Sequence, residues 1–303
     1  NALDANTTAD NNTAVGFNSL GSNQTGSNNV AVGANSLDAN TTADNNTSFG
    51  YNSLTGNTTG SDNVAVGSAA LRDNTTASNN VAIGRLSLSA NTTGAANVAV
   101  GTNALDANTT ANNNTAVGFG ALGTNTTGTQ NTAVGCNALD ASTTADNNTA
   151  IGESALGANT TGTDNVVVGA LAADANTTGS YNTAVGKEAL GTNNTGSFNT
   201  AIGRFALLDN TTGDSNTALG TNALANNTTA TGNTSVGTNS LNTNTTGESN
   251  TAVGFSTLNQ NTASNNTAVG YGALNQNTTG GNNVAVGRLA LDSNTTGVSN
   301  TAC

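Results

Sequence analysis

A pentad of the form Asn-Thr-Ala-Val-Gly returns along the whole chain, and its spacing constrains the fold more than any other feature. It first runs from Asn12 to Gly16, and its glycine then recurs every 17 residues, with one step of 16 residues between Gly254 and Gly270. A fixed short period is typical of stacked-repeat proteins, in which each unit contacts only its neighbours. The period therefore predicts one coil for every 17 residues.

The composition of a coil favours strands over helices. Seventeen residues are too few for two helices, and the apolar residues show no 3.6-residue period. Asn and Thr bond back to the backbone and Gly loses entropy in helices, whereas a β-branched pentad between Asn and Gly fits a strand. We predict an all-β parallel β-solenoid, or β-roll, of about 18 coils, forming one continuous domain over residues 1–303. Each coil is expected to hold two short strands, one on the pentad and one near Ala-Leu-x-x-Asn-Thr.

The coil positions have distinct predicted roles. Alternation along a strand leads us to place Val15 and Leu20 inside the roll and Ala14 on a smooth outer face. The pentad glycine marks a positive φ or a crowded backbone approach, and the pentad asparagine is expected to stack in amide ladders. The residues assigned to this structural ladder are Asn12, Val15, Gly16, Leu20, Asn29, Gly33, Asn80, Gly84, Asn114 and Gly118.

Irregular positions sharpen the prediction. Leu returns four residues after each glycine except at Ala173, where we expect Leu171 to fill the space. The missing residue of the coil at 255–270 is placed near Thr262, in a turn, where its loss leaves the strands in register. A second small residue alternates between Ala and Gly, so we predict that Gly118→Val destabilises the roll far more than Gly128→Ala.

Composition excludes several functions. The net charge is −12, from 17 acidic and 5 basic residues, so no basic stripe is available for a nucleic acid. No apolar run approaches the ~18 residues of a membrane span. The chain has no histidine, which removes a His-based triad and a His metal site; we expect no catalytic residue, metal or cofactor. Stacking would hold Cys136 and Cys303 too far apart for a disulfide.

Two surface features are candidates for contacts. The residue after each pentad glycine varies freely, which suits either a solvated rim or an edge that recognises a partner. The Asn-x-Thr triplets match the acceptor for N-glycosylation, and their Thr pairs are candidates for O-glycans, with a purely structural turn ladder as the alternative. The candidate contact edge comprises Phe17, Tyr51, Phe119, Phe255 and Tyr271, and the candidate glycan positions are Asn6, Thr7, Thr8, Asn40, Asn57, Asn74, Asn91 and Asn108.

The repeat of this chain resembles the repeats of two known groups of proteins. The stretch Asn79-Asn80-Val81-Ala82-Ile83-Gly84 resembles the N-S-V-A-I-G head repeat of trimeric autotransporter adhesins, which implies a left-handed parallel β-roll, a trimer and a bacterial surface adhesin. The longer run A-L-x-x-N-T-T-G-x-x-N-T-A-V-G is similar to repeats of bacterial and phage tail-fibre-like proteins.

Three functional hypotheses follow, and none of them is enzymatic. The preferred one is a structural extracellular or cell-surface fibre or adhesin stalk, assembled end to end or as a homo-oligomer, with surface glycans or a host receptor as further partners. We expect the chain to be a segment of a longer fibre or to polymerise end to end. The alternatives are an ice-binding solenoid, whose regular Thr rows order water, and a receptor-binding phage fibre.

Overall fold

The structure is a computed structural model that describes residues 1–303, and it confirms the all-β parallel β-solenoid with a 17-residue spacing. It contains 18 short strands and no helix. The chain divides into two compact units, Asn1–Asn147 and Asn148–Cys303, which are described separately. The single continuous domain stays a prediction.

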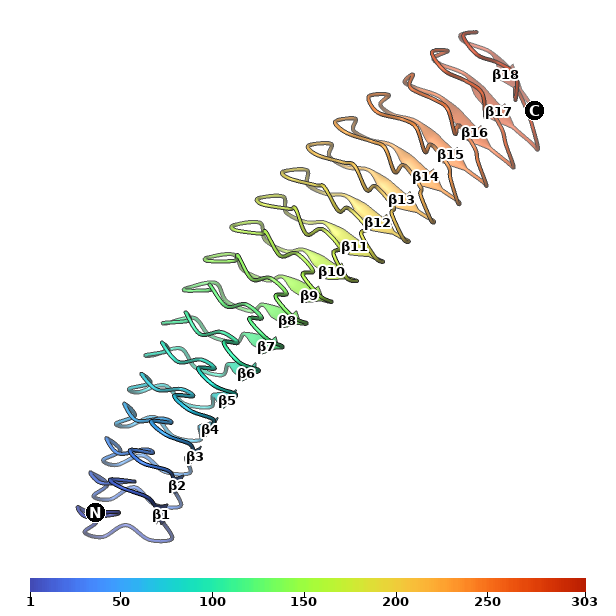
Figure 1. Cartoon of the computed structure of the whole chain (residues 1–303). Coiled ribbons are helices and arrows are strands. Elements are labelled where there is room, and N and C mark those ends of the chain that lie inside the picture. Colours follow the sequence, from blue (N-terminus) through green and yellow to red (C-terminus); the bar gives the residue numbers. More distant parts are fainter. The chain divides into compact units, whose positions relative to one another are not determined.

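Every coil contributes one strand, and all but the last strand have three residues (Figure 1). The strands of the first unit are β1 (Thr13–Val15), β2 (Val30–Val32), β3 (Thr47–Phe49), β4 (Val64–Val66), β5 (Val81–Ile83), β6 (Val98–Val100), β7 (Thr115–Val117) and β8 (Thr132–Val134). Those of the second unit are β9 (Thr149–Ile151), β10 (Val166–Val168), β11 (Thr183–Val185), β12 (Thr200–Ile202), β13 (Thr217–Leu219), β14 (Thr234–Val236), β15 (Thr251–Val253), β16 (Thr267–Val269), β17 (Val284–Val286) and β18 (Thr301–Ala302).

Within each unit, every strand pairs in parallel with the strand of the next coil. Thr13 lies opposite Val30, and the same one-to-one register continues from coil to coil. At the shortened coil Thr251 lies opposite Thr267, so the deletion leaves the strands in register. Identical positions of successive coils therefore stand in columns.

The second predicted strand of each coil does not form. The segment after the pentad glycine is a turn in which Asn18 and Leu20 adopt left-handed conformations, with φ of 56° and 50°. Two left-handed residues so close together bend the chain too sharply for an extended strand. The turn still bonds to the next coil, because the Leu20 N–H donates to the Ser36 carbonyl at 3.1 Å.

The strand faces are the reverse of the prediction. Leu20 is buried as expected, but Val15 is 58% exposed, whereas Ala31, the middle residue of β2, is fully buried. The reason is a narrow core: the Ser48 and Ser53 hydroxyl oxygens, five residues apart in one coil, lie 2.5 Å from each other across it. Only a small side chain fits in the middle of the strand, so Val and Ile take the outer face.

A compensating pair of substitutions supports this account of the core. Val167 is the one middle strand residue that is larger than Ala or Ser, and it is buried in the same coil in which Ala173 replaces the usual Leu. The larger strand residue thus offsets the lost volume, as tolerated core changes do. Leu171 was predicted to fill this space, but it is partly exposed and lines a surface pocket instead.

Candidate functional site

The outer face of the strands is a regular surface in each unit. It carries the first and third residues of every strand, which alternation turns away from the buried middle residue. No strand contains a charged residue, although the chain has a net charge of −12. In the first unit the exposed apolar side chains on this face are Val15, Phe49, Val66 and Ile83; in the second they are Ile151, Val166, Ile202, Leu219, Val269, Val284 and Val286.

The two units differ in the first row of this face. In the first unit, valine stands at Val30, Val64, Val81 and Val98, so four of the strands read Val-x-Val or Val-x-Ile. In the second unit the row reads Thr in all but two strands. The first face is therefore more apolar, and the second presents regularly spaced hydroxyl groups.

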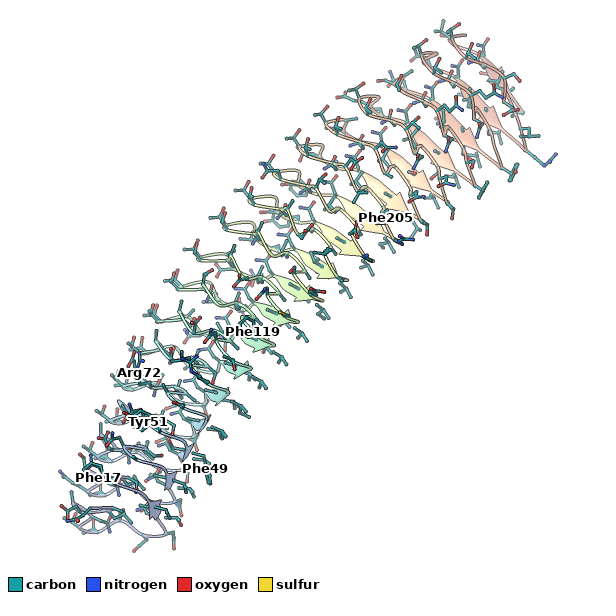
Figure 2. All side chains as sticks on the ribbon, in the orientation of Figure 1. Phe17, Phe49, Tyr51, Arg72, Phe119 and Phe205 are labelled. Carbon is teal, nitrogen blue, oxygen red and sulfur yellow. The ribbon has the colours of Figure 1, made fainter.

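The predicted contact edge lies on the surface, at the corner that follows the pentad glycine. Phe17 is 73% exposed, and Tyr51, Phe119, Phe255 and Tyr271 are exposed as well. Figure 2 labels three of these residues along the first unit. Phe255 and Tyr271 stack with ring centroids 5.5 Å apart, and the Arg288 guanidinium carbon lies 5.6 Å from the Tyr271 centroid. Recognition of a partner by this edge stays a prediction.

A second aromatic pair was missed by the sequence reasoning. Tyr181 and Phe198 stack at 5.0 Å with nearly parallel rings, and both are exposed. They occupy the turn position just before the pentad asparagine, where most other coils have Asn, Asp or Ser. The sequence signal for this pair was that aromatic residues occupy the same, mostly polar, coil position in two consecutive coils.

Two asparagine columns form hydrogen-bonded ladders inside each unit. In the column that opens the pentad, the Asn29 N–H donates to Asn12 Oδ1 at 2.8 Å, and Asn29 Nδ2 donates to the Ala43 carbonyl. In the second column, Asn40 Nδ2 donates both to Asn23 Oδ1 at 2.8 Å and to the Ala43 carbonyl. Stacked coils thus satisfy the polar groups of a core that has little apolar volume.

Most of the predicted glycan positions belong to the second asparagine ladder. Asn40, Asn57, Asn74, Asn91 and Asn108 are fully buried, and the side-chain nitrogen of each donates to a neighbouring asparagine and to a backbone carbonyl. A sugar on that nitrogen has no room in the folded coil, so these five positions are corrected to structural ones. In the first coil Asn6, Thr7 and Thr8 are exposed, and their glycosylation stays a prediction.

The second asparagine column has one defect, at Ser142. The serine is too short to continue the ladder, so the buried Asn125 Oδ1 and Ser142 Oγ have no hydrogen-bond partner. An unpaired buried polar atom costs about 1–3 kcal/mol. The defect identifies a position where the natural sequence is not optimal for stability.

We expect Ser142→Asn to raise the free energy of unfolding by about 1–3 kcal/mol. The new amide nitrogen can donate to Asn125 Oδ1 and to the Ala145 carbonyl, as the equivalent asparagines do in neighbouring coils. Chemical denaturation followed by circular dichroism measures the change. Ser142→Ala is the control, because it leaves Asn125 Oδ1 unpaired; equal stabilities of the two variants would contradict the ladder.

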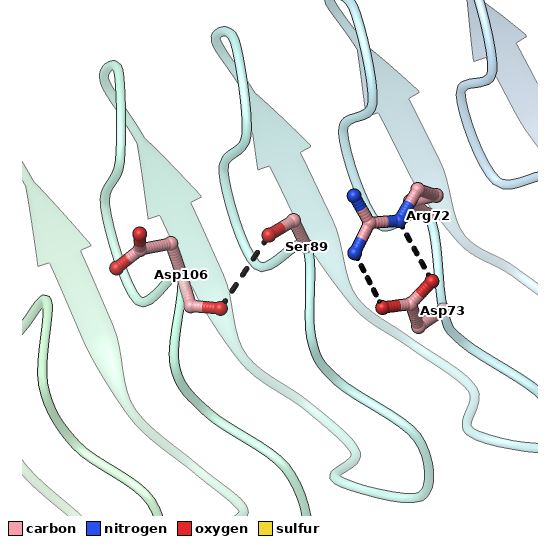
Figure 3. Close-up of polar contacts among 4 residues, drawn as sticks. All are labelled: Arg72, Asp73, Ser89 and Asp106. Carbon is pink, nitrogen blue, oxygen red and sulfur yellow. Dashed lines mark hydrogen bonds and ion pairs between the residues drawn. The ribbon is translucent and has the colours of Figure 1, made fainter.

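Most charged side chains lie on the turns and are scattered. Arg72 forms a two-pronged ion pair with the adjacent Asp73, with nitrogen–oxygen distances of 2.7 Å (Figure 3). In the same close-up, Ser89 Oγ donates to the backbone carbonyl of Asp106. No group of three or more His, Cys, Asp or Glu side chains is placed to hold a metal ion, and Cys136 and Cys303 are free and exposed.

Two carboxylates two coils apart approach the same glycine. A Cβ on Gly123 would lie 3.2 Å from Asp140 Oδ1 and 3.5 Å from Asp106 Oδ1. Burial raises the pKa of both aspartates above the ordinary value of 3.8, and repulsion from Asp140 raises that of Asp106 further. In the second unit, burial and then Glu188 raise the pKa of Asp174, which lines the pocket with Leu171 and Leu208.

The raised pKa values predict a pH dependence of stability. A carboxyl group whose pKa is higher in the folded state stabilises the fold below its unfolded pKa, and this contribution is lost as the pH rises through the folded pKa. We expect Asp140→Asn to stabilise the chain at pH 7, with an advantage that shrinks as the pH falls through the raised folded-state pKa and is lost below the ordinary pKa of 3.8. Thermal melts across pH test this, with the exposed Asp44→Asn as control; a pH-independent advantage would contradict it.

Comparison with models of known protein families and with curated protein sequences gave no match to this chain. No helix long and apolar enough to cross a membrane is present. The class of the protein therefore rests on its fold, which is that of a β-solenoid repeat protein.

Proposed function

We propose that this chain is a non-enzymatic structural element of an extracellular or cell-surface fibre, in which copies associate side by side through the outer strand face. The observation that carries the proposal is the uncharged apolar face of β1–β8. Large exposed apolar surfaces commonly mark sites of protein association. The corner side chains after the glycines are our candidates for contacts with surface glycans or a receptor.

The energetics favour a second copy as the partner of this face. Fully burying a Val or Ile side chain contributes roughly 1.5–3 kcal/mol, and Ile83 is 40% exposed and Phe49 41%. Acidic side chains elsewhere would repel another copy, but the strands bring no charge into the contact. Because both copies have the same coil spacing, rows of outer side chains can interdigitate over many coils.

Sedimentation of the whole chain tests the proposal. We expect a homo-oligomer, with a mass that is a multiple of 29.4 kDa. The double variant Val66→Lys and Val100→Lys places two charges on the strand face, two coils apart, and should sediment as a monomer with an unchanged circular dichroism spectrum.

The matched control is Thr59→Lys with Thr93→Lys, which adds the same charges to exposed turn positions and should leave the oligomer intact. A wild-type chain that stays at 29.4 kDa at all concentrations would refute association through this face.

A further inference from the structure

The outer strand face of the second unit carries an unbroken row of threonines. Six consecutive strands, β11–β16, begin with Thr, and each of these residues lies directly opposite the next. Beside this row, two residues along each strand, runs a second row of Val, Ile or Leu. The first row consists of Thr183, Thr200, Thr217, Thr234, Thr251 and Thr267, and the second of Val185, Ile202, Leu219, Val236, Val253 and Val269.

The hydroxyl groups of this row are free. None of the six side chains makes a hydrogen bond within the protein, since the bonds at this face are those of the backbone ladder. The first threonines of the turn pairs behave differently: Thr211 Oγ1, for example, donates to the Thr228 carbonyl at 2.9 Å. The strand threonines therefore offer their hydrogen-bonding capacity to water alone.

The geometry makes this face a two-dimensional array. Neighbouring strands lie about 4.8 Å apart, and residues two apart along a strand lie about 6.6 Å apart. The spacing between neighbouring threonines of the row is therefore close to the shorter lattice repeat of hexagonal ice. The array repeats over six coils without a charged residue or a shift of register.

Each threonine presents two kinds of group to the water above it. Its methyl group, like the neighbouring Val or Ile, cannot hydrogen-bond, so water over it must bond to other water. Its hydroxyl can anchor that water at a fixed point. A lattice of methyl groups and hydroxyl anchors thus favours an ordered water layer that can merge with an ice surface.

We propose that the Thr and Val/Ile/Leu rows of β11–β16 bind ice. The inference goes beyond the structural role, because that role was argued from the Val-rich face of the first unit. Ice, rather than a dissolved ligand, is the occupant that matches a periodic and uncharged array with free hydroxyl groups.

Thermal hysteresis and ice recrystallisation of the whole chain test the proposal. The wild type should show a gap between melting and freezing and should keep ice grains small. Thr217→Lys with Thr251→Lys breaks the array at β13 and β15, and we expect both effects to fall to the level of buffer. Thr212→Lys with Thr246→Lys, at exposed turn positions, should retain them.

A triple valine variant tests the array with less risk of unfolding the protein. Thr200→Val, Thr217→Val and Thr234→Val remove three hydroxyl groups with little change of volume, and Val already occupies this position at Val166 and Val284. We expect a normal melting curve with a partial loss of hysteresis. Absence of hysteresis in the wild type, or equal loss in the turn control, would overturn ice binding; if the oligomer persists in that case, the structural role stands.

Discussion

Replacing Asn80 with alanine is expected to lower the free energy of unfolding by about 3–5 kcal/mol, because several buried polar groups lose their partners together. Asn80 Nδ2 donates to the Gly94 carbonyl at 2.9 Å, and Asn80 Oδ1 accepts from the backbone N–H of Asn97 at 2.9 Å and from Asn97 Nδ2. Alanine leaves these groups unpaired and adds a cavity in a core where Asn80 is fully buried. Denaturant titration followed by circular dichroism measures the loss.

The matched control for this experiment is Asn79→Ala, the same substitution one residue earlier. Asn79 is exposed and adopts a left-handed conformation with φ of 64°. Alanine already occupies this position in the next coil, at Ala96, with φ of 57°. We expect a change of about 1 kcal/mol or less. Similar losses for the two variants would show that the asparagine column does not stabilise the stack.

Replacing Gly118 with alanine is expected to lower the free energy of unfolding by about 3 kcal/mol or more, from backbone strain combined with steric overlap. Its φ is +138°, a conformation that essentially only glycine adopts. A Cβ there would meet the Gly135 carbonyl oxygen and lie 2.6 Å from the carbonyl carbon. Since both atoms belong to the backbone of the next coil, relief requires the coils to separate.

Gly120→Ala is the control, two residues away. Gly120 also has a positive φ, of +63°, but a Cβ there meets only the side chain of Asn137, and Ala69 occupies the same coil position with φ of 57°. We expect a small change in the melting temperature. Equal shifts for the two variants would contradict the role of the pentad glycine.

The structure also changes the choice of control that the sequence suggested. Gly128 was expected to accept alanine freely, because Ala111 and Ala145 occupy the equivalent position. A Cβ on Gly128, however, would meet the Ala145 carbonyl oxygen and lie 2.5 Å from Asn125 Oδ1. Alanine in one coil therefore does not show that the next coil has room for it.

The period made the stacked architecture predictable, because a residue that returns every 17 positions can stand in a column only if each coil closes on itself. The direction of the side chains was not predictable from the same pattern. Alternation says only that Val15 and Ala14 face opposite sides; which side is the core depends on its width. The contact between Ser48 and Ser53 shows that width, and no local sequence signal reports it.

The left-handed turn after the pentad glycine could not be predicted from the sequence either. Leu is rarely found at positive φ, so a column of Leu reads as strand or helix, yet Leu20 and its equivalents adopt φ near 50°. Bonds to the next coil, such as that from Leu20 to the Ser36 carbonyl, and full burial of the side chain offset the local strain. Tertiary contacts of this kind override residue preference.

The central claim is that each 17-residue coil advances the stack by one strand. The most direct test is the distance between spin labels in the first unit, measured by pulsed electron resonance on labelled chain diluted with unlabelled chain, after Cys136→Ser and Cys303→Ser. Labels at Val15→Cys and Val100→Cys stand five coils apart, and those at Val15→Cys and Val134→Cys stand seven. At about 4.8 Å per strand, we predict narrow distributions near 24 Å and 34 Å. Broad distributions whose mean grows with the square root of chain length would contradict the solenoid.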